Sequence, residues 1–173
     1  MMNYINHFVY HLLVCADDGI LVTFDDLQGT KAAIPMPYNN INWINGHTIH
    51  RDVYGNKSGA YTATVSGNNA LFNAKGSPLN MISIDGKLIK LHSAVAAALW
   101  HDNLLLTVTG YRSSIIIREQ TFTLQVFTPN YITFDGYLEL DAVLFSTSGG
   151  TKNPYVPGNG QHFGMDNICL TFI

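Results

Sequence analysis

The chain has 173 residues, of which 12% are charged and 47% are hydrophobic, and its formal net charge is −3 at pH 7. This length suits one domain that buries its own core, and the charged fraction is about half that of an average soluble domain. Only nine Lys and Arg residues occur, spread singly, so no basic stripe is available for a phosphate backbone, and we expect no nucleic-acid partner.

Residues 1–18 form an apolar N-terminal segment before a predicted domain at 19–173. Val14, Cys15 and Ala16 fit the small-residue pattern of a secretory cleavage site, although no Lys or Arg precedes Lys31. The segment is therefore either a signal-peptide remnant or a docking strand. Its apolar run is too short to span a bilayer, so we expect no transmembrane segment. The low charge combined with plentiful Asn, Thr, Ser, Gly and Tyr resembles the composition of an extracellular β-protein, so we expect an extracellular or cell-surface location.

Residues 19–29, GILVTFDDLQG, alternate like a β-strand and end in two adjacent acids, Asp25 and Asp26. Neighbouring strand residues point to opposite faces, so an extended run turns one acid toward the interior, where an uncompensated charge is costly. Either a partner compensates the inward acid or the chain bends before it.

The same alternation recurs along the rest of the chain, and no segment sustains helical periodicity. Strands are predicted over residues 61–66, 82–84, 104–108, 122–126, 138–145 and 162–173. The apolar stretch 93–101 is predicted as a strand or a single turn. Because turn residues separate many short strands, we predict one all-β domain, an antiparallel β-sandwich of the jelly-roll, galactose-binding-like type.

Two predicted loops, 34–59 and 147–161, are longer than the others and rich in Pro, Gly, Asn and aromatic residues. Carbohydrate sites on β-sandwiches combine aromatic faces with a few polar groups, although loop aromatics also fold back as lids on the core. We expect Trp100, inside an apolar run, to belong to the core. The candidate ligand-binding residues are Tyr38, Trp43, Asn45, Asp52, Tyr54, Tyr155 and Gln161.

Two cysteines, Cys15 and Cys169, lie near opposite ends of the chain. They can form a disulfide if the first and last strands are neighbours, and the alternative is two small buried apolar side chains. Asn56, in Asn-Lys-Ser, is the acceptor of the one N-glycosylation sequon, which matters only in a secreted chain.

Six stretches together resemble a group of secreted β-sandwich proteins found in bacteria and some eukaryotes. They are VTFDDL (22–27), IPMPYNNINWIN (34–45), VSGNNALFN (65–73), DNLLLTVTGYR (102–112), STSGGT (146–151) and FGMDNI (163–168). The corresponding motifs of the group are ITFDDL, IPxGYxGLNWxN, VSGxNVAFN, DGLTVTVTGYR, SSGGT and FAMDNI. The resemblance covers 19–173 and implies the fold without implying an activity.

More distantly, the early acids and the closing strand around Asp166 resemble the galactose-binding-like jelly rolls of many carbohydrate-binding modules. In those folds an early acid and a late aspartate commonly meet at a structural calcium ion. The resemblance therefore implies Ca²⁺ at Asp25 or Asp26 together with Asp166. The alternative is that Asp166 caps a turn and that the early acids are solvated at a strand end.

The sequence contains none of the common catalytic motifs, so we expect that the protein is not an enzyme. A sandwich-fold glycosidase is the third option, after the two non-enzymatic functions that follow. The prediction is a non-enzymatic extracellular or cell-surface β-sandwich that binds a carbohydrate or glycoconjugate, with calcium as a structural ion. The alternative is a self-assembling surface, filament or matrix subunit, a homo-oligomer joined through strand edges or its N-terminal segment.

Overall fold

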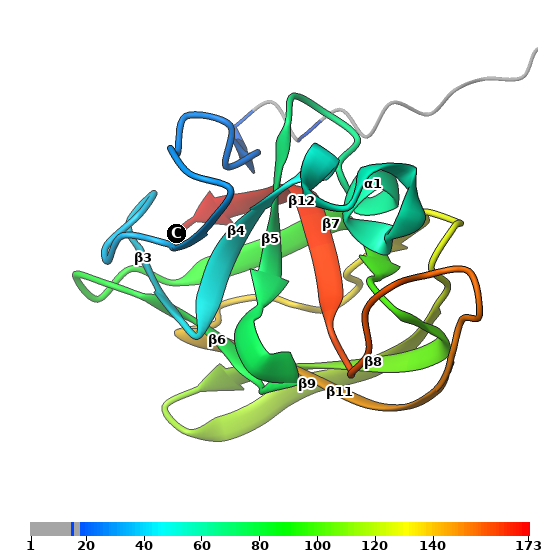
Figure 1. Ribbon diagram of the computed structural model, residues 1–173. Coiled ribbons are helices and arrows are strands. Elements are labelled where there is room, and N and C mark those ends of the chain that lie inside the picture. The colour runs from blue at the N-terminus through cyan, green and yellow to red at the C-terminus, as the bar shows by residue number, and fades with distance from the viewer. Residues whose placement is uncertain (1–14, 16–17) are drawn as a thin grey trace, which may run out of the picture.

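Two antiparallel sheets pack face to face in the computed structural model, which describes Cys15 and residues 18–173 (Figure 1). One sheet has seven strands, in the order β10-β7-β12-β5-β4-β2 with β1 also on β12, and the other has five, in the order β3-β6-β11-β8-β9. The prediction of an all-β antiparallel sandwich is therefore confirmed.

The seven-stranded sheet consists of β1 (Ile20–Val22), β2 (Lys31–Ala33), β4 (Gly46–His50), β5 (Asn69–Asn73), β7 (Ile89–Ala98), β10 (Asn130–Thr133) and β12 (Phe163–Phe172). The five-stranded sheet consists of β3 (Ile41–Ile44), β6 (Leu79–Ser83), β8 (His101–Arg112), β9 (Ile115–Leu124) and β11 (Ala142–Lys152). The helical turns are η1 (Arg51–Val53), η2 (Gly55–Lys57), α1 (Gly59–Ala63) and η3 (Ala74–Gly76).

The core lies between the sheets, where alternation places large apolar side chains from both. Trp43, Phe145 and Phe163 are each at most 1% exposed, and Trp43 meets the ring of Phe24 edge to face at 5.4 Å. Burial of about 150–250 Å² per aromatic side chain makes these residues major contributors to stability.

Strand β12 lies in the middle of its sheet, and two different strands pair with successive parts of it along one side (Figure 1). It pairs with β5 at Gly164 and Met165, and with β1 at residues 168–170. Between these pairings the strand bulges, with Asn167 at φ +51°. The first and last strands are therefore neighbours, and a disulfide joins Cys15 to Cys169, with the two Cα atoms 5.3 Å apart.

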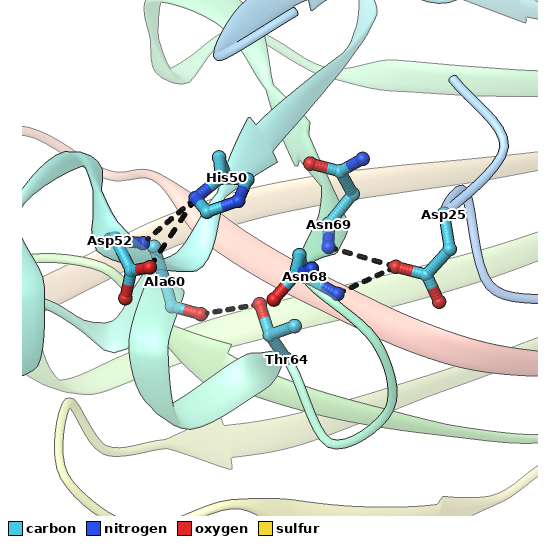
Figure 2. Close-up of polar contacts among 7 residues, drawn as sticks. All are labelled: Asp25, His50, Asp52, Ala60, Thr64, Asn68 and Asn69. Carbon is cyan, nitrogen blue, oxygen red and sulfur yellow. Dashed lines mark hydrogen bonds and ion pairs between the residues drawn. The ribbon is translucent and has the colours of Figure 1, made fainter. Parts of the chain in front are cut away.

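The predicted strand at 61–66 is wrong, because this segment begins with helix α1. The Oγ of Ser58 caps the helix by accepting a hydrogen bond from the Ala60 N–H at 3.0 Å. The Thr64 hydroxyl donates to the Ala60 carbonyl at 2.8 Å (Figure 2). A single helical turn is too short to produce a helical period, so local alternation masked it. Helix α1 contacts β7 and β12 on the outer side of their sheet (Figure 1).

The predicted loop at 34–59 is also wrong, since it contains β3, β4, η1 and η2. The predicted loop at 147–161 begins later, because β11 continues to Lys152. The predicted signal remnant or docking strand at 1–18 falls largely outside the described residues. Within the described part of the chain, no helix has both the length and the apolar character needed to cross a bilayer.

Candidate functional site

A cavity of about 230 Å³ lies on the face of the seven-stranded sheet that is turned away from the second sheet. Six separate parts of the chain build it, and the sheet order brings them together here. They are strands β2, β4 and β5, the turn before η2, the turn between β7 and β8, and the loop after β11. The lining residues are Lys31, Ile49, Tyr54, Phe72, Leu99, Trp100, Gly158, Asn159 and His162.

Aromatic side chains supply the main walls of this Tyr54–Trp100 cavity. The two rings meet edge to face, with centroids 4.7 Å apart and an interplanar angle of 83°. The Nζ of Lys31 lies 4.3 Å from the Tyr54 ring centroid and donates a hydrogen bond to its hydroxyl. A Cβ added to Gly158 would lie 2.4 Å from the Trp100 ring, so only glycine allows the loop backbone to approach this closely.

Besides the Lys31 ammonium and the Tyr54 hydroxyl, the polar side chains that line the cavity come from the loop after β11. The Nδ1 of His162 is buried and has no hydrogen-bond partner among the described residues. Burial lowers the pKa of His162, and the charges of nearby His101 and Lys31 act in the same direction, while the nearby Gly160 backbone acts in the opposite direction. Exposed Asn159 lies with its Oδ1 2.7 Å from the Nε2 of His101.

This arrangement suits a small, partly apolar ligand. Its volume is below the ~300–1,000 Å³ of pockets for drug-sized ligands, and its aromatic walls with a few polar groups match the usual composition of ligand sites. A neutral imidazole nitrogen without a partner can accept or donate one hydrogen bond, according to its tautomer. The cavity can therefore hold one ring-sized group by stacking and by a small number of directed hydrogen bonds.

Of the seven predicted ligand-binding residues, only Tyr54 lines this cavity. The prediction that Trp43 binds the ligand is corrected by its position. Trp43 lies on β3, is 1% exposed, and its Nε1 donates to the Tyr38 carbonyl at 3.1 Å, so it belongs to the core. The Nδ2 of Asn45 is engaged by three backbone carbonyls, of Ala74, Ser77 and Pro78, and it therefore holds a turn.

The remaining predicted residues lie elsewhere. The Tyr38 ring stacks on Phe24, and its hydroxyl donates to the Oδ1 of Asp26 at 2.5 Å. Asp52 is exposed in η1, and Tyr155 is 78% exposed. The Nε2 of Gln161 donates to the Gly149 carbonyl at 3.2 Å. The predicted glycosylation site, Asn56, is exposed in η2, and its modification stays a prediction.

Of the predicted calcium acids, Asp25 and Asp166 both accept backbone N–H groups of the segment 65–69. The Oδ1 of Asp25 accepts the backbone N–H groups of Asn68 and Asn69 at 2.7 and 3.0 Å (Figure 2). A Cβ added to Gly67 would lie 2.1 Å from the Asp25 carboxylate, so glycine is required beneath it. Phe24 has φ +63°, so the chain bends before the acids and leaves both exposed.

Asp166 is the acid that is truly buried, at 0% exposed. Its Oδ2 accepts from the backbone N–H groups of Val65 and Ser66 at 2.9 and 3.0 Å, and its Oδ1 accepts from the N–H of Asn167 at 2.7 Å. Burial raises the pKa of Asp166 to about 6, and the charge of Asp25 adds to the rise, while these hydrogen bonds act in the opposite direction.

These contacts do not fit a calcium ion at the three predicted acids. Calcium takes six to eight oxygen ligands, whereas the Oδ2 of Asp166 faces N–H groups and Asp26 faces a tyrosine hydroxyl. Within the described part of the chain, no three His, Cys, Asp or Glu side chains are grouped to hold a metal ion. Backbone amides thus take the compensating role that an ion was expected to play, and calcium stays a prediction for direct measurement.

Known proteins were compared with the chain by sequence and by structure. No protein-family model and no curated protein matches the sequence. The structure is similar to a DUF4465 family protein from Bacteroides caccae, with a TM-score of 0.64 and 16% identity over 88% of this chain and 98% of that one.

Two further solved structures are similar. A DUF4465 family protein from Bacteroides ovatus has a TM-score of 0.55 and 8% identity, covering 88% of this chain and 98% of that one. The K2 cleaved adhesin domain of Lys-gingipain has a TM-score of 0.50 and 11% identity, covering 90% and 99%. At these identities the likeness concerns the fold, so the chain shares the β-sandwich architecture of these proteins.

Proposed function

We propose that this protein is a non-catalytic, extracellular carbohydrate-binding domain and that the Tyr54–Trp100 cavity is its binding site. The observation that carries the proposal is an aromatic-walled cavity of one-ring size that is lined by His162, whose buried Nδ1 makes no hydrogen bond with any described residue. An apolar sugar face packs on aromatic rings, and its hydroxyl groups use the polar atoms.

The extracellular part of the proposal is supported by the disulfide between Cys15 and Cys169 and by the low charged fraction. Disulfides persist in oxidising environments and are rare in the cytosol. A surface of Asn, Thr, Ser and Tyr, in place of charged residues, is compatible with such an environment.

Binding is tested by glycan-array screening of the intact protein, followed by titration calorimetry of any glycan that binds. Tyr54→Ala removes one wall of the cavity, and we expect an affinity loss of about tenfold or more, from about 1.5 kcal/mol of lost stacking. Tyr155→Ala is the matched control, because Tyr155 is 78% exposed and lies outside the cavity. Equal affinity of both variants and the wild type would reject this site.

The alternative function, assembly into a surface structure, is favoured by one observation. Strand β9 is at the edge of its sheet, and its first residues, Ile115, Ile116 and Ile117, are 67%, 56% and 46% exposed. Exposed apolar edge strands pair readily with another copy. Light scattering tests this directly: an oligomer that Ile116→Lys converts to a monomer would support assembly, and a wild-type monomer at all concentrations would contradict it.

A further inference from the structure

A second cavity, of about 250 Å³, lies at one end of the sandwich and is polar. His50 on β4 and Asn69 on β5 are register partners that line it, and the segment containing Asp25, Gln28 and Thr30 closes it. Along β4, His50 follows Ile49, which lines the Tyr54–Trp100 cavity, so alternation turns the two cavities to opposite faces of the same sheet.

Asn69 is 6% exposed, and one of its polar atoms has no partner among the described residues. Its Nδ2 donates to the carbonyls of Phe24 at 3.3 Å and Leu27 at 3.1 Å, which fixes the amide orientation, because the reversed amide would face two carbonyls with its oxygen. The Oδ1 is buried and makes no hydrogen bond with any described residue. Figure 2 shows this oxygen on the side of the amide that faces His50.

An unsatisfied buried acceptor costs about 1–3 kcal/mol, so a donor group is expected to reach it. The cavity beside it is where such a group can be placed.

The contact of one ring nitrogen of His50 assigns a proton to the other ring nitrogen. The Nδ1 accepts the backbone N–H of Asp52 at 3.2 Å, so it carries no hydrogen, and the proton lies on Nε2 (Figure 2). His50 therefore offers a donor to the cavity on the same sheet face as the Asn69 acceptor.

Asp25 offers a second acceptor. Its Oδ1 is held by the N–H groups of Asn68 and Asn69, whereas its Oδ2 makes no hydrogen bond with the described residues. The carboxylate is thus fixed by the backbone and keeps one oxygen for a ligand.

We propose that this second cavity binds a neutral vicinal diol, as carried by one sugar unit or by a small polyol. One hydroxyl accepts from the Nε2–H of His50 and donates to the Oδ1 of Asn69, and the neighbouring hydroxyl donates to the Oδ2 of Asp25. The site is separate from the Tyr54–Trp100 cavity and does not depend on the proposed function.

The same three groups select against other ligand classes. A cation would meet the positive end of the His50 N–H, and an anion would meet the Asp25 carboxylate and the Asn69 oxygen. A single hydroxyl would use only part of the set. A diol matches one donor and two acceptors together.

The test is NMR titration of the full, isotope-labelled chain. The diol probes are methyl glucoside, methyl galactoside, glycerol and inositol, which separate sugar units from polyols, and the controls are 2-propanol and calcium chloride. We expect saturable shifts of the Asn68 and Asn69 backbone amides and of the Asn69 side-chain NH₂ with at least one diol, and none with the controls.

Asp25→Asn keeps an acceptor for the two backbone amides and replaces the free oxygen by a donor. We expect the diol affinity to fall by about tenfold or more, as for loss of a hydrogen bond to a charged group. Asp26→Asn is the matched control, since this neighbouring acid bonds to Tyr38 outside the cavity and should leave the affinity unchanged. If Asp25→Asn does not fold, His50→Phe removes the donor at a partly exposed position and should weaken binding similarly.

Absence of shifts with every diol would overturn the proposal and leave the cavity to an ordered water molecule. Shifts produced by calcium, or a diol affinity that is unchanged in both Asp25→Asn and His50→Phe, would overturn it as well. Tyr54→Ala should leave these shifts intact, so failure of the first cavity as a glycan site is distinguishable from failure of this one.

Discussion

The buried carboxyl of Asp166 predicts an unusual dependence of stability on pH. Asp166 is 0% exposed and makes no ion pair with any described residue, and its pKa is raised to about 6 by burial. Because the folded-state pKa lies above the unfolded value of 3.8, the folded protein binds this proton more tightly. The group therefore contributes stability at low pH that is lost as the pH rises through about 4 to 6.

The size of this effect follows from the two pKa values. A difference between about 6 and 3.8 corresponds to about 3 kcal/mol, of which about 2 kcal/mol is lost between about pH 4 and about pH 7.5. Asp166→Asn cannot ionise, so this loss should be absent in the variant. The free energy of unfolding of the variant minus that of the wild type should therefore rise by about 2 kcal/mol across the same interval. Any difference that the amide itself introduces does not depend on pH and leaves this rise unchanged.

Urea unfolding at a series of pH values measures the difference directly, and subtraction removes all groups that titrate in both proteins. Asp26→Asn is the control for removal of a negative charge at the surface. Parallel wild-type and Asp166→Asn stability curves would refute this reasoning. They would mean that the hydrogen bonds from Val65, Ser66 and Asn167 offset the burial of the carboxylate completely.

Three further predictions concern the disulfide, the cavity wall and calcium. The disulfide closes a sequence separation of 154 residues, so Cys15→Ser should lower the free energy of unfolding by about 3–5 kcal/mol in denaturant titrations, and an unchanged value would show that the bond adds nothing. Gly158→Ala places a Cβ 2.4 Å from the Trp100 ring, so glycan binding should be lost at a cost of about 1–3 kcal/mol in stability; unaltered binding would contradict the cavity geometry. Because backbone amides compensate Asp25 and Asp166, we expect the same melting temperature in calcium and in chelator. A calcium-dependent rise that Asp166→Asn removes would establish the ion.

The β-sandwich could be predicted because two-residue alternation and turn residues are local signals. Neighbouring first and last strands were only the condition for the disulfide, and β1 does pair with β12. Helix α1 could not be predicted, since a single turn capped by Ser58 has no period to detect. Trp43 was assigned to a loop by its Asn-rich neighbours, yet burial against Phe24 decides its place in the core.

Most of the candidate site lay beyond local sequence analysis. Lys31, Trp100, Asn159 and His162 meet only because β2 and β4 lie beside β5 and the loop after β11 folds over the outer face. Trp100 is buried as predicted, at 5% exposed, but it also forms a wall of the cavity, which an apolar sequence context does not reveal. The Gly-Asn-Gly run at 158–160 was a usable signal, because closely spaced glycines mark close backbone approach.

The central claim, that the Tyr54–Trp100 cavity holds a sugar ring, is tested most directly by the two tryptophan indole N–H resonances. Trp100 lines the cavity, whereas Trp43 is 1% exposed in the core, so the protein carries its own control. With a glycan selected on the array, we expect a saturable shift of the Trp100 indole signal and a stationary Trp43 signal. A bound glycan that leaves the Trp100 signal unmoved would contradict it.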